Sequence, residues 1–128
     1  MSVNIEASVK TPAINMSESE GNISIRGISI PEDPHEFYGP LTEAISEYKV
    51  TPAERTVLNL HLEYFNTSST LIIRNLIKEL HGIKAKTDLV VNWYFESDDE
   101  DMKEAGEEFA LLFADIKFNV TAVDSFAQ

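Results

Sequence analysis

Four consecutive polar residues, Asn66-Thr67-Ser68-Ser69, have the side chains best placed to do chemistry in this sequence. They follow an alternating, strand-like segment and precede an apolar helical segment that begins at Leu71. The side-chain oxygens of Asn, Thr and Ser accept hydrogen bonds from the free N–H groups of a first helical turn. The pattern therefore predicts a Thr or Ser at the rim of a sheet, where a second protein can modify its hydroxyl. Helix capping alone explains the same residues, and the local pattern by itself favours this plainer interpretation.

An acidic run is the second conspicuous feature, and it contains Asp98, Asp99, Glu100 and Asp101. Its spacing differs from that of an EF-hand loop, which needs a Gly at the sixth position and a bidentate Glu at the twelfth. We therefore expect no metal site here. We interpret Ser97 or Asp98 as the cap of a helix whose first-turn acids complement the helix dipole. The same acids are candidate contacts for basic residues on a partner.

A hydrolase triad could in principle combine Ser68, His61 and one of the many acids. However, the sequence lacks the Gly-x-Ser-x-Gly elbow of such enzymes, and nothing in it suggests an oxyanion hole. It also lacks the glycine-rich loops that bind nucleotide phosphates. No two histidines have metal-ligand spacing on a helix. We therefore expect a protein that is not an enzyme and has no cofactor.

Composition and charge restrict the possible partners. The chain has 128 residues, no cysteine and a formal net charge of −12, with a pI near 4.5. Nucleic acid and anionic membrane surfaces attract clustered Lys and Arg, so both are unsuitable partners. No segment looks like a signal peptide or approaches the roughly 20 apolar residues of a membrane span. We expect a cytoplasmic protein that binds other proteins, with residues 1–128 forming one domain.

The elements that position these residues follow an α/β pattern. Alternating segments indicate strands, and apolar positions at helical spacing indicate helices between them. Such an order implies crossover connections and a mixed sheet that starts with an antiparallel hairpin. The predicted strands are Ile14–Met16, Ile23–Ile28, Val57–Tyr64, Asp88–Phe95 and Lys117–Val123, and the predicted helices are His35–Tyr48, Leu71–Leu80 (stopped by Gly82) and Met102–Phe113.

Several sequence blocks together resemble the SiaC family of regulatory phosphoproteins. The resemblance extends over a core of about residues 11–123, and the Tyr-Phe-Asn-Thr-Ser-Ser block combined with Asn-Trp-Tyr is its most specific part. The blocks are Thr11-Pro12, Arg26-Gly27, Pro31-Glu32, Leu62-Glu63-Tyr64-Phe65-Asn66-Thr67-Ser68-Ser69, Val91-Asn92-Trp93-Tyr94, Asp98-Asp99-Glu100-Asp101-Met102 and Ala105-Gly106-Glu107.

The resemblance implies a single compact α/β domain similar to the STAS-type anti-sigma-factor antagonists. It also implies a partner-switching protein, in which a kinase phosphorylates a hydroxyl and a PP2C-type phosphatase removes the phosphate. In the studied branch, the unphosphorylated form activates a diguanylate cyclase and so acts on cyclic di-GMP and biofilm behaviour. The family's phosphoacceptor falls on Thr67, whereas spacing alone does not separate Thr67 from Ser68, Ser69 or Thr70.

Two other interpretations remain open from the residues alone. In the first, the protein is a constitutive binding scaffold and Thr67 only caps a helix. In the second, it is a small enzyme that uses Ser68, His61 and a carboxylate. A Thr67 exposed on a flat or convex surface would favour the phosphorylated switch, and a pocket joining Ser68 to His61 would favour the enzyme.

Overall fold

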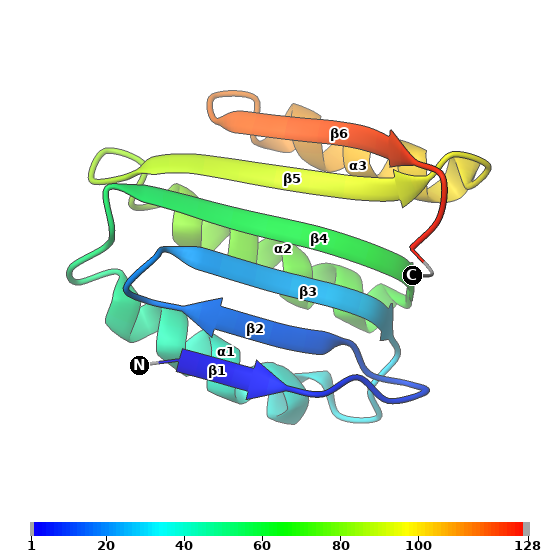
Figure 1. Ribbon diagram of the computed structural model, residues 1–128, viewed down its shortest axis with the longest axis horizontal. Coiled ribbons are helices and arrows are strands. Elements are labelled where there is room, and N and C mark those ends of the chain that lie inside the picture. The colour runs from blue at the N-terminus through cyan, green and yellow to red at the C-terminus, as the bar shows by residue number, and fades with distance from the viewer. Residues whose placement is uncertain (1, 127–128) are drawn as a thin grey trace.

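Six strands form one mixed sheet in the computed structural model, which describes residues 2–126 (Figure 1). The strands lie in sequence order across the sheet: β1 and β2 are antiparallel neighbours, as are β2 and β3, and β3 to β6 run parallel. The strands are β1 (Ser2–Ile5), β2 (Ala13–Ser17), β3 (Asn22–Ser29), β4 (Arg55–Phe65), β5 (Asp88–Glu96) and β6 (Lys117–Val123). The helices are α1 (Pro34–Tyr48), α2 (Thr67–His81) and α3 (Glu100–Leu112). The predicted α/β class and its N-terminal hairpin are confirmed.

Each parallel pair of strands is joined by one helix, and all three helices lie on the same face of the sheet (Figure 1). This follows from the topology, because crossovers between parallel strands share one hand and the strands advance in one direction across the sheet. No helix formed by residues 2–126 covers the opposite face. The carboxyl ends of β3, β4 and β5 meet at one edge, where all three helices begin.

The core lies between the sheet and the helix layer. In β4 the alternate residues Leu58, Leu60 and Leu62 are each about 1% exposed, which is the period of two expected for a strand with one buried face. From α2, Ile73 and Ile77 are fully buried against the sheet. Removing each such side chain from water contributes roughly 1.5–3 kcal/mol. The apolar faces read from the sequence are therefore the faces that hold the two layers together.

Two local features differ from the sequence-based expectation. The strand β1 was not predicted, because four residues are too few to show a period; in the structure it pairs with β2. The cap of α3 was predicted at Ser97 or Asp98 and this is wrong. The cap is Asp99, whose carboxylate accepts the N–H of Met102 at 3.0 Å. In a run of several acids, the residue that caps is decided by where β5 ends and the chain turns.

Candidate functional site

Thr67 is the first residue of α2 and lies at the sheet edge where the helices begin. The strand β4 ends at Phe65, and Asn66 then adopts an extended conformation with φ −91° and ψ 176°. The side-chain oxygen of Asn66 accepts the N–H of Ser69 at 3.0 Å, so Asn66 is the cap among the three candidates Asn66, Thr67 and Ser68. Because Asn66 is the cap, Thr67 and Ser68 occupy the first two helical positions. Both are exposed.

Ser69 differs from its two neighbours, because its side chain points into the protein. It is fully buried, and its hydroxyl donates to the main-chain oxygen of Ser29 at 3.0 Å. The hydroxyl of Ser29 in turn donates to Oγ of Ser69 at 2.9 Å. Thr70 is partly buried, and its hydroxyl donates to the main-chain oxygen of Asn66 at 3.1 Å. Thr67 and Ser68 are thus the two hydroxyls of this block that a second protein can reach.

The surroundings of Thr67 suit an added negative charge. The N-terminus of a helix carries a partial positive charge and N–H groups without partners in the helix. The first turn of α2 has no acidic residue, and the only acid in the helix is Glu79, three turns further along. Asn66 satisfies the N–H of Ser69 but leaves the two preceding N–H groups to solvent or to a ligand. A phosphate is a ligand of this kind.

The acidic residues lie at the same sheet edge as Thr67, after β5. Asp98, Asp99, Glu100 and Asp101 line a shallow, open hollow together with Glu96. Asp99 caps α3, and Glu100 and Asp101 are in the first turn of that helix, where their charge complements the dipole. Within residues 2–126, no group of three or more His, Asp and Glu side chains is arranged to hold a metal ion.

His61 is directed away from Ser68, toward the face of the sheet that no helix covers. Its ring stacks on Tyr94 of β5, with centroids 4.4 Å apart and planes 13° from parallel. Nδ1 of His61 is buried and has no hydrogen-bond partner among the described residues. Burial lowers the pKa of His61, and the charge of Arg26 on the neighbouring strand lowers it further. The hollow beside His61 is lined by Arg26 and residues 123–126, and Ser68 is not part of it.

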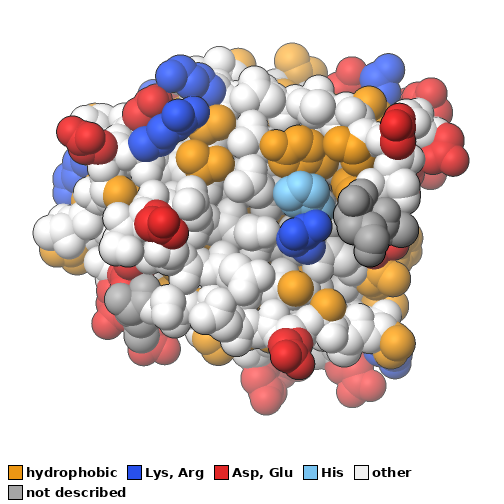
Figure 2. Space-filling model, in the orientation of Figure 1, with side chains coloured by type: hydrophobic (Ala, Val, Ile, Leu, Met, Phe, Trp, Pro, Cys, Tyr) orange, Lys and Arg blue, Asp and Glu red, His pale blue; other side chains and the backbone are white. Residues whose placement is uncertain are grey.

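The uncovered face also carries a row of amides that we did not predict. Asn59, Asn92 and Asn119 are register partners on β4, β5 and β6. Nδ2 of Asn92 donates to Asn59, and Nδ2 of Asn119 donates to Asn92, each at 3.0 Å. Figure 2 shows this face, whose centre is mostly neither charged nor apolar. The signal was present in the sequence, since each Asn stands at an outward position of an alternating strand.

The fold and the Thr67 region define a protein with an accessible hydroxyl at a helix N-terminus, built on a two-layer α/β domain. Residues 5–123 match the SiaC family of regulatory phosphoproteins. The match covers most of the chain, and the protein therefore belongs to this family. The resemblance seen in the sequence blocks is confirmed.

The chain is also similar to individual proteins over most of its length. The chain is 28% identical over 110 residues to an uncharacterised protein of Pseudomonas aeruginosa strain UCBPP-PA14, covering 84% of this chain and 86% of that one. The crystal structure of apo-SiaC from P. aeruginosa superposes with a TM-score of 0.80 at 24% identity, covering 98% of this chain and 99% of that one. A second structure, of the diguanylate cyclase SiaD in complex with its activator SiaC from P. aeruginosa, gives a TM-score of 0.81 at 24% identity, covering 94% and 97%. These structures share the fold described above. No helix within residues 2–126 is long and apolar enough to cross a membrane.

Proposed function

We propose that this protein is a phospho-regulated partner-switching protein with no catalytic activity of its own, and that Thr67 is its phosphoacceptor. A kinase adds the phosphate, a PP2C-type phosphatase removes it, and the state of Thr67 controls binding to an output partner in the cytoplasm. The observation that carries the proposal is a difference in accessibility among the adjacent hydroxyls of residues 67–69. Thr67 is exposed at the first position of α2, whereas Ser69 is buried and doubly hydrogen-bonded.

The physical effect of the phosphate falls on partners rather than on the fold. A phosphate adds about −1.5 to −2 charges and three strong acceptor oxygens at neutral pH. At the N-terminus of α2 it meets the positive end of the helix dipole and free N–H groups, so the folded state tolerates it. A partner that covers Thr67 without a cation must bury that charge, which is costly. A partner that presents Arg or Lys there gains instead.

The output partner that we propose is a diguanylate cyclase, which would link the switch to cyclic di-GMP and biofilm regulation. Support comes from the solved complex in which SiaC of P. aeruginosa is the activator of the diguanylate cyclase SiaD. The acidic residues Asp98, Asp99, Glu100 and Asp101 lie at the same sheet edge as Thr67 and are candidates for a secondary contact with that partner. Asn66 and Ser68 flank the acceptor and would be covered with it.

The test is phosphopeptide mapping of the protein isolated from its native cells. We expect one phosphoryl group, located on Thr67, that disappears in Thr67→Ala and persists in the matched control Ser68→Ala. Both positions are exposed and adjacent, so the pair separates a specific acceptor from general accessibility. Phosphate on Ser68 would keep the mechanism and move the site. Unmodified protein under every growth condition would instead favour a constitutive scaffold of the same fold.

A further inference from the structure

The exposed crest of α2 carries an unusual set of side chains for so acidic a protein. Thr67, Leu71, Arg74 and Lys78 are spaced by four, three and four residues and are all exposed. At 100° per residue, this spacing keeps the four side chains within a narrow stripe that points away from the buried face of the helix. The stripe is about 16 Å long at 1.5 Å per residue. We call these four residues the α2 crest.

Charge sets the α2 crest apart from the rest of the helix layer. The helix α1 carries three glutamates and no Lys or Arg, and α3 carries five acids and one Lys. In α2 the only acid is Glu79, and Lys49, which follows the last residue of α1, already binds it at 2.5 Å. Arg74 and Lys78 form no ion pair with any residue in the described part of the chain. The crest is therefore a cationic line between two acidic helices.

Leu71 adds an apolar contact point to this line. Its side chain is 57% exposed, although the side chains of the next two residues, Ile72 and Ile73, are buried. A single exposed leucine is ordinary on a protein surface. Here, however, it lies one helical turn from Thr67 and one turn from Arg74, so any partner that covers Thr67 along the helix also meets Leu71 and the two cations.

We infer that the α2 crest is the docking surface for one acidic segment of a partner protein, and that the phosphate on Thr67 cancels the charge that attracts it. Acids of the segment face Arg74 and Lys78, and an apolar side chain covers Leu71. The segment must be narrow, because α1 and α3 on either side would repel a broad acidic surface. The crest carries two formal positive charges, and a phosphate adds about −1.5 to −2. Phosphorylation therefore brings the crest close to neutral.

This inference rests on the proposed function for the role of Thr67, but its test does not depend on knowing the partner. A photoreactive benzoylphenylalanine is placed at Leu71 in one variant and at Leu111 of α3, which is 79% exposed, in the matched control. Both are irradiated in native cells, and crosslinked peptides are identified by mass spectrometry. We expect a discrete product from position 71 only, joined to a segment rich in Asp and Glu. No product from position 71, or a segment without acids, overturns the inference.

Charge reversal then separates electrostatic docking from simple proximity. Arg74→Glu and Lys78→Glu should each reduce the crosslinked product about five- to tenfold, an effect expected to weaken at high salt. Lys103→Glu makes the same charge change on the exposed surface of α3 and should have little effect. Replacing the facing acid of the partner by Lys should restore the product with Arg74→Glu. Equal losses in all three variants would overturn the inference.

The state of Thr67 distinguishes failure of this inference from failure of the proposed function. If crosslinking at position 71 depends on Arg74 and Lys78 but is unchanged between phosphorylated protein and Thr67→Ala, the docking surface stands and the switch fails. If phosphorylation blocks a partner that crosslinks from position 111 and not from position 71, the switch stands and the docking surface fails.

Discussion

The hydroxyl of Ser69 donates a hydrogen bond of 3.0 Å to the main-chain oxygen of Ser29, a residue 40 positions earlier in the chain. This bond ties the first turn of α2 to the end of β3. Oγ of Ser29 also contacts the hydroxyl of Tyr38 at 2.6 Å. Since the single proton of Ser29 is directed to Ser69, the phenol of Tyr38 must be the donor in that contact. Burial raises the pKa of Tyr38 to about 12, so the phenol keeps its proton at neutral pH.

Removing the Ser69 hydroxyl should destabilise the protein, because the buried hydroxyl proton of Ser29 loses its acceptor and the main-chain oxygen of Ser29 keeps only the N–H of Asn66. We expect Ser69→Ala to lower the free energy of unfolding by about 1–3 kcal/mol. Ser68→Ala, one residue away and exposed, should change it by less than about 0.5 kcal/mol. Urea denaturation followed by circular dichroism measures both. If the two variants were equally stable, the buried network would not be holding α2 in place.

Gly106 should not tolerate even one added methyl group. A Cβ at this position would lie 2.5 Å from Cδ1 of Trp93, and the indole cannot easily move, because it is about 1% exposed and donates to the main-chain oxygen of Met102 at 3.1 Å. We expect Gly106→Ala to cost about 1–3 kcal/mol by overpacking. Trp93 is the one tryptophan of the chain, so its fluorescence should report the displacement directly.

The clash requires the indole, and this supplies a control for the Gly106 prediction. In a Trp93→Leu background, the additional cost of Gly106→Ala should shrink, since the nearest atoms are absent. An undiminished cost in that background would mean that another part of the structure opposes the methyl group.

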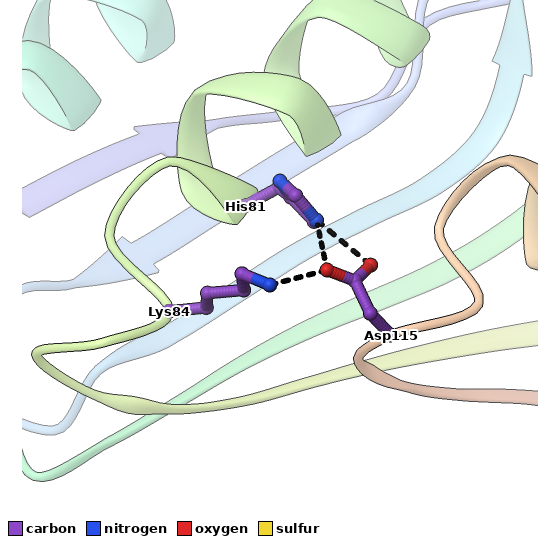
Figure 3. A network of polar contacts seen from close by, with 3 residues as sticks. All are labelled: His81, Lys84 and Asp115. Carbon is purple, nitrogen blue, oxygen red and sulfur yellow. Dashed lines mark hydrogen bonds and ion pairs between the residues drawn. The ribbon is translucent and has the colours of Figure 1, made fainter.

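The loss of stability at acidic pH should depend on Asp115, which lies between His81 and Lys84 (Figure 3). The Lys84 ammonium, and then the hydrogen bonds of 2.9 and 3.0 Å from His81, hold the pKa of Asp115 well below its ordinary value of 3.8. A carboxyl whose pKa is lowered by folding stabilises the folded state above the unfolded pKa. That contribution is lost as pH falls below about 4.

Asp115→Asn should therefore show a shallower loss of stability below about pH 4 than the parent protein. The measurement is the midpoint of urea unfolding as a function of pH. Asp124→Asn is the control, since Asp124 is exposed and forms no ion pair with any other residue in the described part of the chain. Parallel pH profiles for the parent and Asp115→Asn would show that the pair with Lys84 is too exposed to matter.

His61 should be neutral at pH 7 and should become easier to protonate when Arg26 is replaced. Burial lowers its pKa from 6.5, and the charge of Arg26 lowers it further. We expect Arg26→Gln to raise the pKa of His61 without restoring it fully, because burial against Tyr94 remains. Titration of the imidazole by NMR measures this shift, and Lys103→Gln on α3 is the matched control. An unchanged value in Arg26→Gln would show that Arg26 points away from the ring.

The lowered pKa of His61 also makes the stability of the protein depend on pH. Since folding disfavours the charged form of His61, its contribution to stability is present above the unfolded pKa of about 6.5 and is lost as pH falls below that value. His61→Gln should remove this part of the pH dependence, which lies below about pH 6.5.

The sequence by itself determined every element except β1, together with their order and the class of the fold. Alternation in β4, helical spacing in α2 and the group of capping residues before α2 are local signals, because they depend on side-chain period and on N–H groups within one turn. The resemblance to the family indicated Thr67 as the candidate acceptor. This signal is also local, since the block that contains Thr67 is eight residues long, from Leu62 to Ser69, and spans one strand–helix junction.

Only the tertiary structure decided which hydroxyls of that block are accessible. Thr67, Ser68 and Ser69 are chemically similar neighbours, and their spacing alone does not show which of them is the phosphoacceptor. The partner that buries Ser69 is Ser29, which the parallel pairing of β3 with β4 brings to it. The amide row across β4, β5 and β6 and the cationic α2 crest arise in the same way. The amide row depends on which strands become neighbours, and the crest depends on which face of α2 stays exposed. These are relations between residues far apart in the chain, which a local sequence period does not reveal.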